Sequence, residues 1–128
     1  MSRTSEWLDG YVRAWASKDP DDVRALFTED GEYWFRPDDP HPVRGLDAIV
    51  EMWRTEDEPT EPVHELRVLI ENDQLGIITG QVDYPGHQRY FNMWEVHFAP
   101  DGRAARFVEW FMKPRRGASA EATDDPVI

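Results

Sequence analysis

A carboxylate stands among large apolar side chains near the end of the chain. In the stretch ARFVEWFMKP, residues 105–114, Glu109 lies between Val108 and Trp110. A poorly hydrated carboxyl has a raised pKa, so it can exchange a proton near neutral pH as a general acid or base. Two interpretations stay open: proton transfer on a small molecule, or a buried glutamate that an Arg, a His or Asn92 holds as part of the structure.

The same alternation links Glu109 to the preceding segment. If residues 104–113 form a strand, Phe107, Glu109 and Phe111 share one face. In RYFNMWEVHF, residues 89–98, the pattern puts Asn92 and Trp94 on one face. The Asn92 amide is then a candidate donor to a substrate carbonyl or to Glu109, and a hydrogen bond across the sheet is the alternative.

Aromatic residues supply the candidate ligand contacts. Tyr11 and Trp15 lie one helical turn apart, so the Tyr11 hydroxyl either meets a ligand or packs in the core. Small-molecule sites combine aromatic walls with a few polar groups. If the domain forms such a site, its further candidate lining residues are Trp34, Trp53, Trp94, Phe107, Phe111 and, from a Pro-rich loop, His41.

Composition argues against several other chemistries. The net charge of −12 speaks against nucleic acid as a partner, because phosphates are bound by basic clusters. The chain has no cysteine, and its four histidines lack metal-ligand spacing, so neither a metal nor an organic cofactor is predicted. No apolar run resembles a signal peptide or the roughly 20-residue span of a membrane helix. We therefore expect a cytoplasmic protein that acts without a membrane.

Hydrophobic periodicity predicts the elements that hold these residues. Apolar residues at helical spacing predict three helices, over residues 5–19, 19–27 and 45–56. Ser5 and Asp19 are the expected N-caps of the first two. A turn at Asp30-Gly31 and a short aromatic strand over 33–35 are expected between the second and third helices. Residues 55–62, TEDEPTEP, are expected to be a solvated loop without a catalytic part.

Four longer strands follow, at roughly ten-residue spacing, over residues 63–72, 75–84, 89–98 and 104–113. The pattern predicts an α+β domain with the helices packed on one face of a mostly antiparallel sheet. We expect a single domain over residues 1–114 and a disordered tail over 115–128.

This order of elements resembles the nuclear transport factor 2-like superfamily, above all its SnoaL-like branch with polyketide cyclases and ketosteroid isomerases. The similarity rests on LFTEDGEYWF, PVRGLDAIVEMW, NMWEVHFAPDGR and FVEWFM. It implies a cone-shaped half-barrel with a mixed, curved sheet and a pocket between helices and sheet. It also implies a homodimer that pairs through the outer sheet face.

The resemblance carries over to particular residues only in part. Tyr11 matches the tyrosine of ketosteroid isomerases, but Phe35 and Trp94 stand where those enzymes have their base and their acidic proton donor. Glu109 matches the acidic residue on the last strand of SnoaL-like cyclases. The resemblance thus implies a cofactor-free isomerase, cyclase or dehydratase that works through Glu109, and not a steroid isomerase. The alternative is a non-catalytic binding or scaffold protein of the same fold.

The outer face of the predicted sheet carries its own signal. Phe91, Met93, Val108, Trp110 and Met112 would share that face, rimmed by charged side chains. An apolar patch with a charged rim is typical of a partner surface. The sequence therefore predicts homodimerisation through this face.

Overall fold

The computed structural model describes residues 2–115. Apart from Arg115, the predicted disordered tail lies outside these residues. Along the described chain the elements are α1 (Arg3–Ser17), α2 (Pro20–Arg24), β1 (Phe27–Trp34), β2 (Val43–Arg44), α3 (Leu46–Thr55), β3 (Val63–Glu71), β4 (Leu75–Tyr84), β5 (Gln88–Phe98) and β6 (Ala104–Met112). None of the helices in this part of the chain has the length and apolarity needed to cross a membrane.

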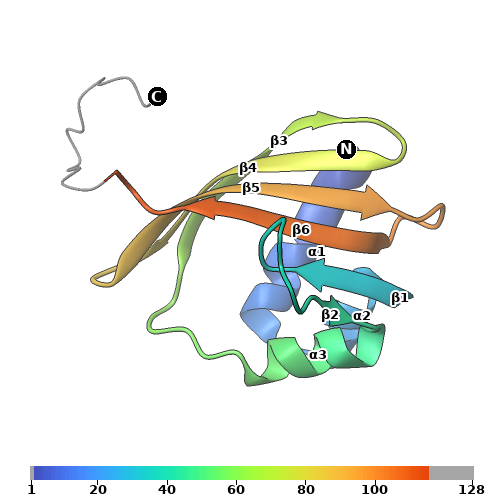
Figure 1. Cartoon of the computed structure of the whole chain (residues 1–128), viewed down its shortest axis with the longest axis horizontal. Coiled ribbons are helices and arrows are strands. Elements are labelled where there is room, and N and C mark those ends of the chain that lie inside the picture. The colour runs from blue at the N-terminus through green and yellow to red at the C-terminus, as the bar shows by residue number, and fades with distance from the viewer. Residues whose placement is uncertain (1, 116–128) are drawn as a thin grey trace.

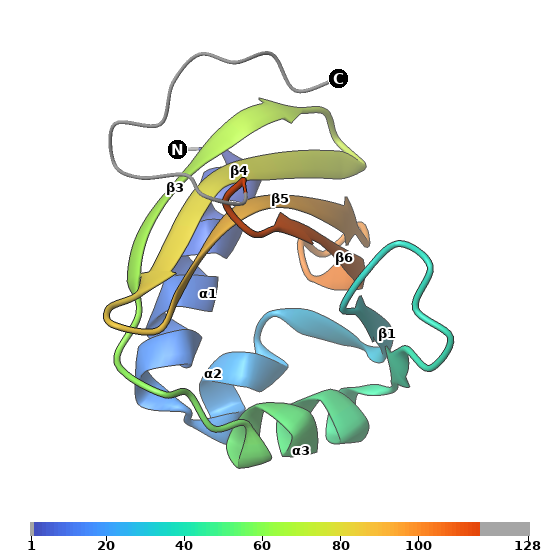
Figure 2. The same cartoon turned by 60° about the vertical axis from the view of Figure 1, so that its left-hand side comes forward.

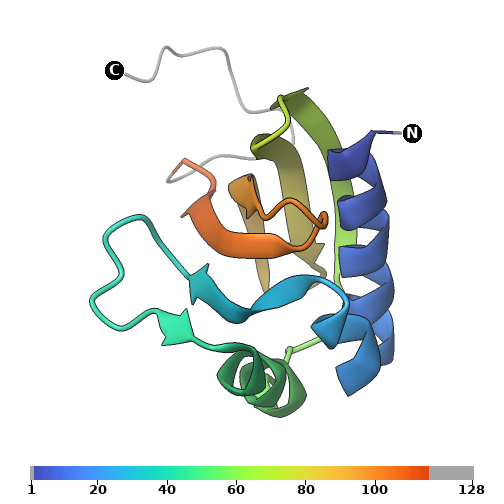
Figure 3. The same ribbon diagram turned by 90° about the vertical axis from the view of Figure 1, so that its right-hand side faces the viewer.

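The strands form one curved, open sheet in the order β2-β1-β6-β5-β4-β3. The β3–β6 meander is antiparallel, while β1 runs parallel to β6, so the sheet is mixed. Figure 1 shows the strands crossing above α3, and Figure 2 shows the sheet arching over the helices. In Figure 3, α1 runs along the concave side while α3 lies below β1. This arrangement confirms the predicted α+β cone.

The first two helices begin where side chains can satisfy their first N–H groups. Asp19 caps α2 as predicted, accepting from the N–H of Asp21, with Pro20 as its first residue. The cap of α1 is Ser2, three residues earlier than predicted. Ser5 instead occupies the third helical position and completes a capping box with Ser2. The apolar spacing marks a helix but not its first turn, which explains the difference.

Asp30-Gly31 is not a turn, which corrects the sequence prediction. Both residues lie inside β1, where the pairing with β6 changes register between Phe27 and Glu32. A β-bulge and a turn favour the same residue types, since both bend the backbone locally. The result is one strand of eight residues in place of the predicted short one.

The two-residue strand β2 was not predicted. It pairs with β1 through Tyr33↔Val43 and Glu32↔Arg44. A strand this short has no periodicity to read, and it follows a Pro-rich segment. Its pairing fixes the end of β1, from which Tyr33 and Phe35 reach the interior.

The core lies between the concave face of the sheet and the helices. Its largest fully buried side chains include Trp94, Phe107, Phe27 and Ile49. Phe107 stacks on Tyr33 with ring centroids 4.6 Å apart and on Tyr11 at 5.8 Å. This aromatic layer ties α1, β1 and β6 together and forms a rigid base under the residues described next.

Candidate functional site

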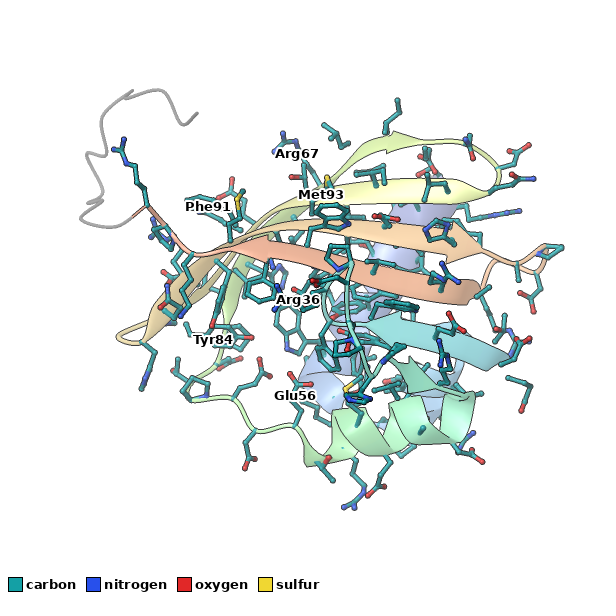
Figure 4. The ribbon with its side chains drawn as sticks, in the orientation of Figure 1. Arg36, Glu56, Arg67, Tyr84, Phe91 and Met93 are labelled. Carbon is teal, nitrogen blue, oxygen red and sulfur yellow. The ribbon has the colours of Figure 1, made fainter. Side chains whose placement is uncertain are left out.

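A cavity of about 220 Å³ opens between α1, the end of α3 and the concave face of β4–β6. Of the described residues, fourteen line it: Tyr11, Trp15, Lys18, Tyr33, Phe35, Trp53, Glu56, Val82, Tyr84, Tyr90, Asn92, Trp94, Glu109 and Phe111. Nine of them are aromatic, and they include all four tyrosines of the chain. Figure 4 shows Glu56 and Tyr84, from the segment after α3 and from the end of β4, at the same end of the molecule.

Glu109 is held by donors from the adjacent strand. The Asn92 amide nitrogen donates to Glu109 Oε2 at 2.9 Å, and the Trp94 indole nitrogen donates to the same oxygen at 3.3 Å. Within residues 2–115 no partner reaches the other oxygen, Oε1. Trp94 stands opposite Glu109 in the pairing of β5 with β6, so the sheet register creates this contact. A proton that Glu109 takes up therefore belongs on Oε1.

Burial raises the pKa of Glu109 to about 7. The hydrogen bonds from Trp94 and Asn92 act in the opposite direction, because they favour the charged carboxylate, and the negative charge of Glu56 raises the pKa further. No Lys, Arg or His of the described chain forms an ion pair with Glu109. Its environment thus makes it a group that changes charge near neutral pH.

This raised pKa predicts a pH-dependent cost to stability. Between pH 4.5 and about 7 the folded state keeps the Glu109 proton and the unfolded state releases it. The free energy of unfolding therefore falls over this window, by about 3 kcal/mol from this group. Glu109→Gln removes the titration, so the free energy of unfolding of the variant rises relative to that of the wild type as pH increases from 5 to 8. Urea unfolding at both pH values measures the difference, with exposed Glu65→Gln as the control. Parallel pH dependence in wild type and variant would contradict the pKa shift.

Two tyrosine hydroxyls form the second polar group of the cavity. The hydroxyl oxygens of Tyr11 and Tyr33 lie 3.2 Å apart, and either one can donate. Burial raises the pKa of both hydroxyls well above the usual value, so both stay protonated at neutral pH. The pair has two protons and uses one between its members. The other proton is left for an acceptor in the cavity.

The mouth of the cavity is organised by Glu58. Its carboxylate accepts from Trp15 Nε1 at 3.0 Å and from the Tyr84 hydroxyl at 2.8 Å. Lys18 Nζ lies 3.4 Å from the same carboxylate. These contacts fasten the segment after α3 to α1 and β4. Residues 55–62 were expected to be a solvated loop, and Glu58 corrects that expectation.

Glu56 is a further cavity residue that the sequence did not reveal. Partial loss of water raises its pKa, Lys18 acts in the opposite direction, and Glu58 adds to the rise. Tyr33 and Tyr84 were missed as well. Alternation on the predicted strands puts Tyr90 on the Asn92 face, although Tyr90 was not named among the lining residues. Glu56 and Glu58 could be found only from the course of the irregular segment after α3, which the sequence does not predict.

Most of the predicted site residues meet at this cavity. Glu109, Asn92, Tyr11, Trp15, Trp53, Trp94 and Phe111 all line it. Phe107 does not line it, because it is fully buried in the layer below, stacked on Tyr11 and Tyr33. Asn92 and Trp53 each keep a buried polar atom, Oδ1 and Nε1, for which the described chain offers no hydrogen-bond partner.

Two predicted contacts lie elsewhere. Trp34 follows Tyr33 on β1 and so points to the opposite face, where its indole nitrogen donates to Glu32 and Arg106 lies 5.4 Å from its ring centroid. His41 is exposed, and its backbone N–H donates to Asp39 Oδ1 at 2.9 Å. Both placements correct the expected pocket wall. The spacing of residues in the sequence does not show which face of the sheet Trp34 points to, and it does not show where the loop that carries His41 runs.

No group of three His, Asp or Glu side chains within residues 2–115 is arranged to hold a metal ion. What the cavity does offer is one titrating carboxyl, one hydroxyl proton and aromatic walls. These groups can exchange a proton with a small molecule and stabilise a negative charge on oxygen.

The fold is shared with solved structures at low sequence identity. A nuclear transport factor 2-like protein of unknown function from Burkholderia xenovorans superposes with a TM-score of 0.69 at 18% identity, covering 88% of this chain and 85% of its own. A candidate ketosteroid isomerase from Kribbella flavida gives 0.69 at 16%, covering 98% and 91%. A candidate polyketide cyclase from Sinorhizobium meliloti gives 0.65 at 19%, covering 86% and 100%.

Comparison with curated proteins gives no match. The structural matches lie below 25% identity, so they establish the fold and not an activity. The sequence itself matches the SnoaL-like domain over residues 8–117, which is most of the chain. The protein is therefore a member of the SnoaL-like domain family, with a nuclear transport factor 2-like fold.

Proposed function

We propose that the protein transfers protons on a small, largely apolar carbonyl compound, as a cofactor-free isomerase, cyclase or dehydratase. The observation that carries this proposal is the state of Glu109. Its carboxyl lines the cavity with a pKa of about 7, and two donors occupy Oε2 while Oε1 has no partner within residues 2–115.

The reaction would begin at a carbon next to the substrate carbonyl. Glu109 Oε1 takes a proton from this carbon, and the electron pair of the broken C–H bond moves to the carbonyl oxygen. The hydroxyl proton left over by Tyr11 and Tyr33 forms a hydrogen bond with that oxygen. Protonated Glu109 then returns its proton to carbon or to a leaving hydroxyl. The net outcome is isomerisation in the first case and loss of water in the second.

The size of the cavity limits the substrate. About 220 Å³ is the volume of roughly seven water molecules in the liquid, and is below the ~300–1,000 Å³ of drug-sized sites. The part of the substrate that enters the cavity is therefore of the order of ten non-hydrogen atoms. The direct test is hydrogen–deuterium exchange at the carbon next to the carbonyl of small ketones, followed by NMR in D₂O. If ketones bind but exchange no faster than in buffer, proton transfer is ruled out.

A non-catalytic binding protein is the second candidate. It is favoured by Phe35 and Trp94, which line the cavity at the positions where the ketosteroid isomerases that this sequence resembles carry carboxylates. Such a protein would bind ketones with no exchange, and cavity substitutions would change affinity alone. The exchange experiment therefore separates the two candidates.

We also propose that the protein pairs with a second copy through the outer face of β5 and β6. Phe91 and Trp110 are each 42% exposed there and Met112 is 69% exposed. Figure 4 shows Phe91 and Met93 on β5, on the side turned away from α1. Val108 does not contribute, because it is buried.

A dimer of this kind predicts that one added charge will separate the copies. Met112→Glu should shift the mass measured by light scattering at micromolar concentration from dimer to monomer, since an unpaired charge in an apolar interface is costly. Ile70→Glu is the matched control, because Ile70 is 67% exposed on the edge strand β3 and should leave the mass unchanged. A monomeric wild type would overturn the proposal.

A further inference from the structure

The cavity holds carboxylates whose charge the protein does not balance. Among residues 2–115, Glu56 and Glu109 line it, together with a single cationic residue, Lys18. Lys18 is paired with Glu58, 3.4 Å away. Within residues 2–115, neither Glu56 nor Glu109 takes part in an ion pair. An unbalanced carboxylate in poorly hydrated surroundings must either take up a proton or receive a positive charge from elsewhere.

The walls of the cavity suit a positive charge on an apolar body. Aromatic ring faces attract cations through the ring quadrupole, most strongly where water is excluded. The protein already shows this contact at the mouth, where Lys18 Nζ lies 5.9 Å from the ring centroid of Trp53. Deeper in the cavity, Tyr11 and Trp94 contact each other with centroids 4.7 Å apart, and both line the same space as Glu109.

One more polar atom favours a cation over an anion. Asn92 is 6% exposed and lines the cavity, and its Oδ1 has no hydrogen-bond partner in the described chain. Its Nδ2 already donates a hydrogen bond to Glu109. The negative end of the amide dipole is thus left without a counterpart beside the carboxylate. An anionic ligand would meet repulsion from both groups.

From these observations we infer that the cavity binds a small alkylammonium compound, with the positive charge beside Glu109 and the alkyl groups against the aromatic rings. The inference rests on the proposed use of this cavity for a small ligand, and it names the class of that ligand. It does not depend on proton transfer. A ligand of the size of choline, with seven non-hydrogen atoms, fits a cavity of about 220 Å³.

The test compares two probes of equal shape and different charge. Choline and 3,3-dimethylbutan-1-ol differ in one atom, a cationic nitrogen in place of a carbon. Isothermal titration calorimetry at pH 8, where Glu109 is ionised, should show choline binding at least tenfold more tightly than the alcohol. Glu109→Gln should reduce this ratio to below threefold. Glu65→Gln, the same charge change at an exposed site on β3, should leave it unchanged.

The pH dependence provides an independent readout on the wild type. Choline affinity should rise between pH 6 and 8, as Glu109 loses its proton. The other titratable groups that line the cavity are Lys18, Glu56 and the tyrosines Tyr11, Tyr33, Tyr84 and Tyr90. Raised pKa values keep Tyr11, Tyr33 and Tyr84 neutral throughout this range. The Glu56 carboxyl also has a raised pKa. Measuring choline affinity against pH for Glu56→Gln shows how much of the pH dependence comes from Glu56.

The inference is overturned if choline does not bind, if the alcohol binds as tightly at pH 8, or if Glu65→Gln weakens choline as much as Glu109→Gln. These results leave proton transfer on neutral ketones untouched, because deuterium exchange is measured separately. Conversely, a strong preference for choline with no exchange on any ketone would support the inference while the proposed catalysis fails. The wild-type comparison of the two probes decides the matter even if a variant does not fold.

Discussion

Glu109→Gln should slow deuterium exchange on a ketone substrate by about 10²–10⁴-fold, the usual contribution of a positioned acid or base. Glutamine has nearly the same shape, and its carbonyl oxygen can still accept from Asn92 and Trp94. It cannot take a proton from carbon. The loss should therefore fall on kcat, with KM nearly unchanged, because a neutral ketone does not need the negative charge of Glu109 in order to bind.

The rate of deuterium exchange should depend on pH in the wild type and should not show this dependence in Glu109→Gln. If ionised Glu109 is the base, the exchange rate rises with pH and levels off above the pKa of about 7. Asn92→Ala removes a hydrogen bond that favours the charged form, so this midpoint should move to higher pH. Glu65→Gln controls for the change in net charge. Full turnover in Glu109→Gln would remove Glu109 from the mechanism.

Gly80→Ala should destabilise the fold by about 3 kcal/mol or more, in the range of the largest single-residue effects. An added Cβ at Gly80 would overlap the backbone oxygen of Glu65 on β3. The backbone there has a φ of 151°, which side chains rarely adopt. Since the obstacle is backbone, it can yield only if β3 and β4 move apart. The midpoint of urea unfolding measures the loss.

Gly86→Ala is the matched control, because Gly86 also has a positive φ, 78°, but open space where a Cβ would stand. It should cost only about 1–2 kcal/mol, the strain of the backbone conformation alone. Gly80 stands opposite Asn92 in the sheet, so any Gly80→Ala protein that folds should also show a disturbed Glu109 titration. Equal losses in the two variants would show that the contact with Glu65 is not the cause.

The sequence by itself determined the fold class and the middle of each long element. Helical spacing in α1 and α3 and alternation in β4–β6 come from burial of one face, which is a local property of the chain. Alternation also indicated which residues share a face with Glu109 and with Asn92, and the family resemblance implied that both faces look into the pocket. Their hydrogen bond is confirmed at 2.9 Å, because the β5–β6 hairpin fixes the register between neighbouring strands.

Only the tertiary structure decided how the ends and irregular segments meet. The cap of α1 and the register shift of β1 between Phe27 and Glu32 depend on a few local bonds that periodicity does not record. Glu56 lines the cavity because Trp15, Lys18 and Tyr84 hold its neighbour Glu58, and these partners lie 26 to 43 residues away along the chain from Glu58. The pKa of Glu109 follows from the same assembly, since packing of distant elements removes the water that would otherwise keep it low.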